Sequence, residues 1–278
     1  MTKRYSSIAD VGTTMGQAAA AHVDLLWRDV MRAHGSVEAD AYFRLITGEG
    51  HPLGNLAIFR AADDTSTVEE AVMPLMTLSQ PTAVLFVAGV SASVSEMLTA
   101  RGFMAIPAMP AMAVDVRALA PTTLPEGYSF FRVTSEADWA EWADTVAAGF
   151  ELPRGLARLL SPEVQGARPE EDAQLQFFGI RHQGRIVATT MLYLADGLAG
   201  IYCVATLPAE RGKGLGAHVT AEALRAALPL GYGVGVLQAT EAWHGVYRGL
   251  GFTDVGSVPM FIRMPGAGVP AETSSDAA

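Results

Sequence analysis

The sequence predicts a mixed α/β fold in which a predominantly antiparallel sheet is flanked by helices, and this arrangement occurs in two domains. Half of the 278 residues are hydrophobic, so the chain can bury one large core or two. From residue 128 onward, strand-like and helix-like segments alternate. Before that point, Ala118–Tyr128 contains two prolines and a glycine, which is typical of a linker between domains.

The alternation after the linker allows each element to be assigned in order. The helix of residues 136–148 follows Ser135, a candidate N-cap. Gln183-Gly184 joins two apolar runs and is typical of a hairpin turn. Strands are predicted at residues 128–133, 175–182, 185–194, 198–206, 232–239 and 252–264, and further helices from the glycine-rich segment near residue 212 to residue 228 and over residues 243–250.

The region before the linker repeats the pattern found at the end of the chain. Gly102-Phe103 and Gly251-Phe252 lie 149 residues apart, and each pair follows a helix-like segment. Pro110 and Pro259, in the strands that follow, are separated by the same 149 residues. The shared offset favours a duplication over two unrelated α/β pieces. We therefore predict domains at residues 1–120 and 126–264 and a tail at residues 265–278 whose composition is typical of disorder.

Composition argues against several classes of function. The formal net charge is −10 and the pI is about 5.0, so the chain lacks the basic surface typical of nucleic-acid binding. The one cysteine, Cys203, excludes an intrachain disulfide and a thiolate metal cluster. The most apolar stretch, Ala83–Val94, is shorter than the ~20 residues that cross a bilayer, and the first ten residues lack the apolar run of a secretory signal. We expect a cytoplasmic protein with no metal, membrane or nucleic-acid partner.

The segment Pro208–Thr220, PAERGKGLGAHVT, leads from a predicted strand into a predicted helix. The first N–H groups of a helix have no partner within it, and the helix dipole adds partial positive charge there. Glycine has no Cβ, so the three glycines of this segment let a ligand approach the backbone closely. Arg211 and Lys213 add full positive charges. The segment therefore predicts an anion site suited to a phosphate or a pyrophosphate.

The spacing of the glycines narrows the kind of phosphate site. Arg211–Gly216 read R-x-x-G-x-G, which differs from the P-loop motif G-x-x-x-x-G-K-[ST] and from the dinucleotide motif G-x-G-x-x-G. Taken alone, this hexamer is equally typical of a glycine-rich turn at a solvated helix start. The segments around the hexamer favour a phosphate site over a solvated turn. The strand before the hexamer ends in VATLP, Val204–Pro208, and the segment VYRGLGF, which contains Tyr247, follows the next predicted strand.

The arrangement strand–VATLPAERGKGLG–helix–strand–LQATEAWHGVYRGLGF–strand resembles the GNAT superfamily of acyl-CoA-dependent N-acyltransferases. The resemblance covers Tyr128 to Met264. It implies an N-acetyltransferase that moves an acetyl group from acetyl-CoA to a primary amine. Together with the duplication, it implies two GNAT-like domains in tandem.

The resemblance also implies a coenzyme site built largely from backbone. The amides of Arg211–Gly216 would hold the coenzyme A pyrophosphate, and the end of the preceding strand would hydrogen-bond the pantetheine arm like an additional strand. Thr240 lies where the family often makes a further coenzyme contact. The residues implied at the coenzyme are Val204, Ala205, Thr206, Arg211, Gly212, Lys213, Gly214, Leu215, Gly216 and Thr240.

Tyr247 lies where the family often has a phenol near the thioester sulfur. Attack of an amine on a thioester expels a thiolate. A phenol of pKa about 10 can donate a hydrogen bond or a proton to a thiolate of pKa about 8.5. The alternative is that Tyr247 is a helix aromatic packed under the turn at Gly251-Phe252.

The sequence leaves the general base open. The strand segment at residues 198–208 contains no Asp, Glu or His, where family members often use a glutamate. Glu151, Asp196 and His244 are candidates, and each is also typical of a solvated polar residue. Cys203 is more typical of a small core residue than of a nucleophile, since no base accompanies it.

The first half lacks the coenzyme motif. The segment RAADDTSTVEE, residues 60–70, has no glycine, and Asp63 and Asp64 would repel a pyrophosphate. Ser66 and Glu69 have the spacing of a capping box, which predicts that a side chain satisfies the helix start. Leu98 stands 149 residues before Tyr247. A degenerate domain of this kind would serve as scaffold, as a wall of the acceptor pocket or as an interface in a homodimer.

The resulting hypothesis is direct attack of an amine on bound acetyl-CoA, with catalysis through proximity and oxyanion stabilisation. The acceptor is expected to be a small molecule, and the acidic net charge favours a cationic amine such as a polyamine, an aminoglycoside-like compound or an amino-acid derivative. A protein N-terminus or lysine stays open. The alternatives are a coenzyme A-binding regulatory module and an enzyme of another reaction type on the same fold.

Overall fold

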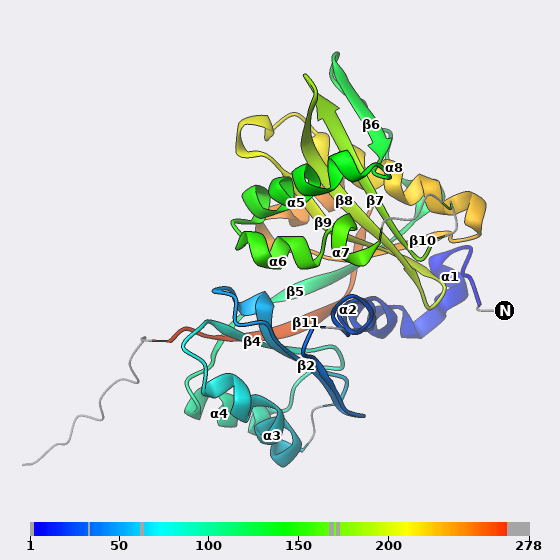
Figure 1. Cartoon of the computed structure of the whole chain (residues 1–278). Helices are drawn as coiled ribbons and strands as arrows, with labels where there is room; N and C mark the ends of the chain where they lie inside the picture. Colours follow the sequence, from blue (N-terminus) through cyan, green and yellow to red (C-terminus); the bar gives the residue numbers. More distant parts are fainter. Residues whose placement is uncertain (1–2, 33, 62–63, 167–169, 171–172, 266–278) are drawn as a thin grey trace, which may run out of the picture.

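The computed structural model describes residues 3–32, 34–61, 64–166, 170 and 173–265, and the predicted tail beyond residue 265 lies outside them. The described strands form one continuous sheet of eleven strands in the order β1-β2-β3-β4-β11-β5-β10-β9-β8-β7-β6. Figure 1 shows this sheet running through both halves of the molecule, with helices packed against it. Among the described helices, none is both long enough and apolar enough to cross a membrane.

The elements are named in chain order. The residues before the linker form α1 (Ile8–Val11), α2 (Met15–Met31), β1 (Val37–Glu38), β2 (Tyr42–Ile46), β3 (Asn55–Phe59), α3 (Thr65–Met76), β4 (Thr82–Phe86), α4 (Ala92–Ala100) and β5 (Met104–Asp115). The residues after it form β6 (Tyr128–Arg132), α5 (Glu136–Phe150), α6 (Arg154–Leu159), α7 (Pro162–Gln165), β7 (Leu175–His182), β8 (Arg185–Ala195), β9 (Leu198–Thr206), α8 (Leu215–Ala227), β10 (Val234–Gln238), α9 (Glu241–Gly249) and β11 (Thr253–Arg263).

Antiparallel pairing dominates the sheet, so the predicted fold class is confirmed. Within the described sheet, β3–β4 and β9–β10 are parallel neighbours, and the other neighbouring strands are antiparallel. The elements predicted after the linker are present, and their ends lie within two residues of the predicted ends except at the start of α8, which begins at Leu215. The sequence pattern does not predict α6 and α7, because helices this short show little periodicity.

The two halves exchange strands at the centre of the sheet. β5 comes from the first half, yet it pairs antiparallel with β10, with Val234 opposite Asp115 and Gln238 opposite Ala111. β11 ends the second half, yet it pairs with β4, with Met260 opposite Leu85. β5 and β11 also pair with each other in the middle of the molecule (Figure 1). Each half is thus completed by a strand from the other.

The exchanged strands are the ones that the duplication relates. The 149-residue offset carries Met104, the first residue of β5, onto Thr253, the first residue of β11. The repeated Gly-Phe pair therefore marks equivalent positions just before the two central strands. The division into domains at residues 1–120 and 126–264 stays a prediction.

Helix α2 covers one face of the sheet where the halves meet, packing on β5, β10 and β11. Its fully buried His22 fills the space beside Gly200 of β9, where a Cβ would lie 2.4 Å from the imidazole Cε1. The His22 Nε2 lies 3.3 Å from the Ala195 carbonyl oxygen, which can only accept a hydrogen bond. The ring proton is therefore on Nε2, and Nδ1 accepts from the Tyr202 hydroxyl at 2.8 Å. Burial lowers the pKa of His22 to about 4.

This buried histidine predicts a loss of stability in mild acid. Below its ordinary pKa of 6.5, the unfolded chain binds a proton at His22 that the folded chain does not bind until pH is near 4. The free energy of unfolding should therefore fall as pH falls, by about 2 kcal/mol between pH 7 and pH 5 from this residue. Urea unfolding at the two pH values measures the loss, and His22→Gln, which keeps both hydrogen-bonding roles, should remove this share of it. An equal loss in the variant would contradict the assignment.

Candidate functional site

The parallel strands β9 and β10 separate in the second half of the molecule. In the described sheet they pair at two positions, Ala199 with Gly235 and Gly200 with Val236, although β9 continues to Thr206. Beyond Gly200, β9 is therefore held by β8 on one edge, and its other edge borders the gap between the strands.

A β-bulge lies on β9 beside this gap. Tyr202 opposes Met191 and Ala205 opposes Thr189, so the two residues between Tyr202 and Ala205 face one residue of β8. Cys203 has a left-handed φ of 52°, and its carbonyl accepts a hydrogen bond from the Thr189 hydroxyl at 3.0 Å. A bulge bends its strand locally, and this one begins two residues after the last pair between β9 and β10.

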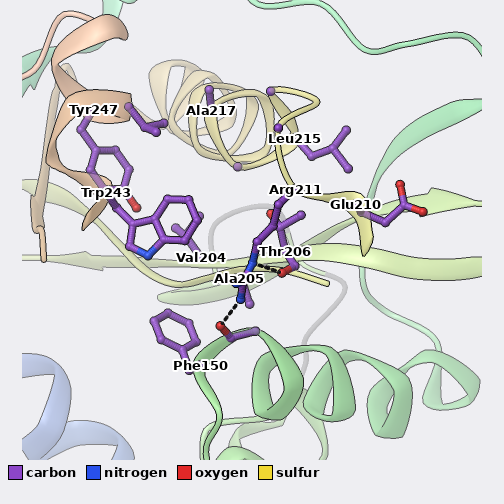
Figure 2. Close-up of a pocket in the computed structure, with 15 residues that line it drawn as sticks. Phe150, Val204, Ala205, Thr206, Glu210, Arg211, Leu215, Ala217, Trp243 and Tyr247 are labelled. Carbon is purple, nitrogen blue, oxygen red and sulfur yellow. Dashed lines mark hydrogen bonds between the residues drawn. The ribbon is translucent and has the colours of Figure 1, made fainter. Parts of the chain in front are cut away.

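A cavity of about 240 Å³ occupies the gap (Figure 2). Four segments supply its walls: the end of α5, the end of β9, the glycine-rich turn with the start of α8, and one face of α9. The lining residues are Gly149, Phe150, Val204, Ala205, Thr206, Glu210, Arg211, Gly212, Gly214, Leu215, Gly216, Ala217, Trp243, Val246 and Tyr247. Of the residues that the sequence predicts at the coenzyme, Lys213 and Thr240 lie outside this lining, and Thr240 is the N-cap residue of α9.

The start of α8 opens into the cavity without a capping side chain. Its N-cap residue is Gly214, in the left-handed region at φ 76°, and Gly212 also has a left-handed φ of 81°. A Cβ on either glycine would meet no atom within 4 Å, so open space lies beside the turn. The first N–H groups of the helix and its positive dipole end are thus available to an anion in the cavity.

Arg211 crosses the cavity, whereas Lys213 turns away from it. The Arg211 Nη2 donates to the Gly149 carbonyl at 3.0 Å, and its guanidinium carbon lies 5.8 Å from the centre of the Trp243 ring. The Lys213 Nζ donates to Glu210 Oε2 at 2.7 Å and to the Tyr128 hydroxyl at 2.9 Å. Hydrogen bonds from Lys213 and Tyr128 lower the pKa of Glu210, so this carboxylate is ionised and already partnered at neutral pH.

Helix α9 turns one face toward the cavity. Trp243, Val246 and Tyr247 lie at i, i+3 and i+4, which places them on the same side of a helix. Tyr247 is 9% exposed, and its ring packs edge-on against Phe252 with centroids 5.9 Å apart. Burial raises the pKa of Tyr247, so the phenol keeps its proton at neutral pH. Among the described residues, none hydrogen-bonds to its hydroxyl, which is free to donate to a ligand.

The candidate bases lie outside the cavity lining. Asp196 is in the turn between β8 and β9, at the opposite end of β9 from the bulge. His244 Nε2 lies 2.7 Å from Asp254 Oδ1, and Glu151 is the C-cap residue of α5. Burial raises the pKa of the Cys203 thiol to about 12, so it is not a thiolate at neutral pH. In the described part of the chain, no group of three His, Cys, Asp or Glu side chains is placed to hold a metal ion.

Several residues that line the cavity were not predicted from the sequence. Trp243 and Val246 could have been found from their helical spacing to Tyr247, and the 43% exposure of Trp243 places it at the rim of the cavity. Phe150 and Gly149 come from the end of α5, far away in the sequence, and no local signal marks them. Glu210 and Ala217 flank the glycine-rich turn.

The first half closes the equivalent gap. β3 and β4 pair at four successive positions, from Leu56 opposite Ala83 to Phe59 opposite Phe86. The rings of Phe59 and Phe86 stack with centroids 5.1 Å apart. Leu98, the counterpart of Tyr247, is fully buried in the core beneath them.

A side chain caps α3 in the first half, but the predicted capping residue is wrong. Asp64, rather than Ser66, is the N-cap residue and accepts hydrogen bonds from the backbone N–H groups of Ser66 and Thr67. Glu69 instead pairs with Arg101. Hydrogen bonds, above all from the Thr67 hydroxyl, lower the pKa of Asp64 to about 2. A carboxylate therefore occupies the place that an anion would need; Asp63 lies outside the described residues.

Comparisons with known proteins agree with this geometry. Residues 138–252 match the family model described as the acetyltransferase (GNAT) family, and this match includes β9, the glycine-rich turn, α8 and α9. A comparison with curated protein sequences finds no match.

Solved structures with similar folds cover both halves of the chain. A GCN5-related N-acetyltransferase from Kribbella flavida is 20% identical with a TM-score of 0.64, and the alignment covers 88% of this chain and 95% of that one. A GCN5-related N-acetyltransferase from Sphaerobacter thermophilus is 16% identical with a TM-score of 0.60 and 94% coverage of each chain. A tandem GNAT protein from the clavulanic acid biosynthesis pathway is 15% identical with a TM-score of 0.50, covering 79% of this chain and 77% of that one. These likenesses establish the fold.

Proposed function

Since residues 138–252 form an acetyltransferase domain of the GNAT family, as the motifs around Arg211–Gly216 predicted, we propose that the cavity beside β9 binds acetyl-CoA and transfers its acetyl group to a primary amine of a small molecule. The observation that carries this proposal is the uncapped start of α8, which opens into a cavity bordered by the unpaired edge of β9. The match of residues 138–252 to the GNAT family model supports a GNAT-type acyltransferase.

The residues present fit a pyrophosphate and its attached arm. The N–H groups from Gly212 to Gly216 would hold the pyrophosphate, and Arg211 would neutralise part of its charge after leaving the Gly149 carbonyl. The backbone edge of Val204–Thr206, which β10 does not reach, would pair with the amides of the pantetheine arm as one strand pairs with another, and Arg211 would release the Thr206 carbonyl that it now bonds. In this arrangement the thioester would lie beside the bulge and within the reach of α9.

Bound acetyl-CoA supplies a thioester that an amine attacks, with loss of the coenzyme thiolate. The backbone N–H groups at the bulge of β9 would stabilise the oxyanion that develops on the carbonyl oxygen. The Tyr247 hydroxyl would donate its proton, or a hydrogen bond, to the departing sulfur. Neither an imidazole nor an unpartnered carboxylate lies among the described lining residues, so the amine would enter as the free base, and after the attack its nitrogen would lose one proton to water and keep the other in the amide product.

Tyr247→Phe should lower kcat by about a hundredfold, because the variant removes the donor to the leaving sulfur. The Phe ring keeps the packing against Phe252, so the affinity for acetyl-CoA should stay within about twofold of the unaltered protein. Steady-state kinetics and calorimetry measure the two quantities. Tyr232→Phe, at a similarly buried tyrosine outside this cavity, is the control. Equal kcat in both variants would make Tyr247 a packing residue.

Calorimetry with acetyl-CoA, followed by thiol release against a panel of amines, tests the whole proposal. Micromolar binding with thiol release supports it. Acetyl-CoA binding without thiol release in the presence of any amine would favour a coenzyme A-binding regulatory module. The lack of a candidate general base among the described lining residues supports this alternative. Absence of binding would reject the site.

The first half is proposed to act as scaffold for the acetyltransferase domain. Its β5 flanks β10, and the Pro110 carbonyl of β5 accepts a hydrogen bond from the Ala239 N–H at 3.0 Å, just before α9. This contact holds the start of the helix that carries Tyr247.

A further inference from the structure

The cavity has an apolar rim at its mouth. The large hydrophobic side chains exposed among the described residues are Val37, Met73, Met104, Phe150, Trp243, Val246 and Met264. Three of these, Phe150 at 41%, Trp243 at 43% and Val246 at 37% exposure, line this one cavity. Apolar side chains that remain exposed and cluster at a cavity indicate a surface that a ligand covers.

The rim belongs to the end of the cavity where acyl transfer would occur. Figure 2 shows Phe150, Trp243 and Tyr247 together at one side of the cavity and Glu210 at the other. Phe150 ends α5, whereas Trp243 and Tyr247 lie on α9, so the two exposed rings come from different walls. The phosphates of the coenzyme would lie at the start of α8. Arg211, which bonds to the Gly149 carbonyl and lies 5.8 Å from the centre of the Trp243 ring, would turn toward these phosphates and so clear the space between the two rings. The rim therefore faces the molecule that approaches the thioester.

The charges of the lining do not suit a polycation. Glu210 is the carboxylate among the described lining residues, and it is already bonded to Lys213 and Tyr128. The other charged lining residue is Arg211, which would repel an ammonium group. A polyamine or an aminoglycoside needs several free carboxylates, so the cationic acceptor expected from the net charge finds no partner in this cavity.

We propose that the acceptor is a primary alkylamine whose chain carries an aromatic ring, that the ring binds between Phe150 and Trp243, and that the nitrogen reaches the thioester beside Tyr247. This inference rests on the proposed function. Two flat side chains on opposite walls favour a flat ring by stacking and by removal of its surface from water. Val246, on the same face of α9, extends the apolar contact.

Two amines that differ by the ring alone test the inference. We expect kcat/KM for 2-phenylethylamine to exceed that for ethylamine by about thirtyfold, the gain when most of a phenyl ring leaves water. Spermidine should be no better than ethylamine. Thiol release from acetyl-CoA measures all three. A ratio near one, or a preference for spermidine, would overturn the inference.

Substitutions in the apolar rim test where the aromatic ring of the acceptor binds. In Phe150→Ser and Trp243→Ser, the ratio of kcat/KM between 2-phenylethylamine and ethylamine should fall to below about 5. Met73→Ser removes a comparably exposed hydrophobic side chain from α3, outside the cavity, and should keep the ratio. Calorimetry measures the affinity of each variant for acetyl-CoA. If the rim variants weaken acetyl-CoA binding tenfold or more and keep the ratio, the rim serves the coenzyme and the inference is wrong.

Different experimental results would overturn the proposed function and the aromatic acceptor. A protein that binds no acetyl-CoA and releases no thiol with any amine overturns both. A protein that acetylates ethylamine and 2-phenylethylamine equally well keeps the function and overturns the aromatic acceptor.

Discussion

Gly214→Glu should abolish acetyl-CoA binding, with a loss in affinity of at least about a hundredfold. Gly214 is the N-cap residue of α8, and its φ of 76° is unfavourable for any residue with a Cβ by about 1–2 kcal/mol. A glutamate there would also place a negative charge at the helix start, where the pyrophosphate would bind. It would fill the space that the structure leaves open beside the turn. Charge repulsion, loss of space and backbone strain would each weaken acetyl-CoA binding.

Two further variants separate these causes. Gly214→Ala adds the backbone strain without the charge and should weaken binding by about tenfold, in line with its conformational cost. Gly89→Glu introduces the same residue at another open glycine with φ of 88°, in a turn of the first half, and should leave binding unchanged. Calorimetry with acetyl-CoA measures all three. Undiminished affinity in Gly214→Glu would mean that the start of α8 holds no phosphate.

The second half expressed alone, as residues 126–264, should fail to fold. Without β5, the edge of β10 from Val234 to Gln238 loses its antiparallel partner, and β11 loses its pairing with both β5 and β4. Removal of α2 would also expose the apolar face of the sheet that this helix covers. A sheet with such edges and an uncovered core aggregates or stays unfolded.

Solubility, circular dichroism and thermal unfolding measure this outcome. Co-expression of residues 1–120 with residues 126–264 as separate chains is the control, because it restores both exchanged strands without the linker. We expect the co-expressed pair to purify together and to bind acetyl-CoA. A soluble, cooperatively unfolding second half on its own would show that the exchange is dispensable for the fold.

The sequence predicted the order of elements after the linker because each element has a local signal. The hairpin dipeptide Gln183-Gly184 and the glycine-rich turn at Arg211–Gly216 are short and specific, and they lie where they were expected. Leu98 at the counterpart of Tyr247 also indicated that the first half lacks a site, and it is a core residue there.

The strand exchange could not be predicted in this way. The local sequence of β5 and of β11 does not show whether each strand pairs within its own half or with the other half, because pairing is decided by contacts distant in the sequence. The same holds for Phe150, which α5 carries to Trp243, and for His22, which fills the space beside Gly200. A lone glycine in a strand indicates a close approach without naming the residue that approaches.

The pairing of the central strands also determines when the sheet can be completed during synthesis of the chain. In the described sheet β5 pairs with β10 and β11, and β4 shares an edge with β11, so neither β4 nor β5 has all its strand partners until the ribosome has made the last strand. From Asp115 to Arg263, at ribosomal rates, the wait is roughly 7 to 30 seconds. During that interval the nascent first half presents β4 and β5 as unpaired edges, which are open to other chains. Those two edges are therefore where association with other chains would begin during synthesis.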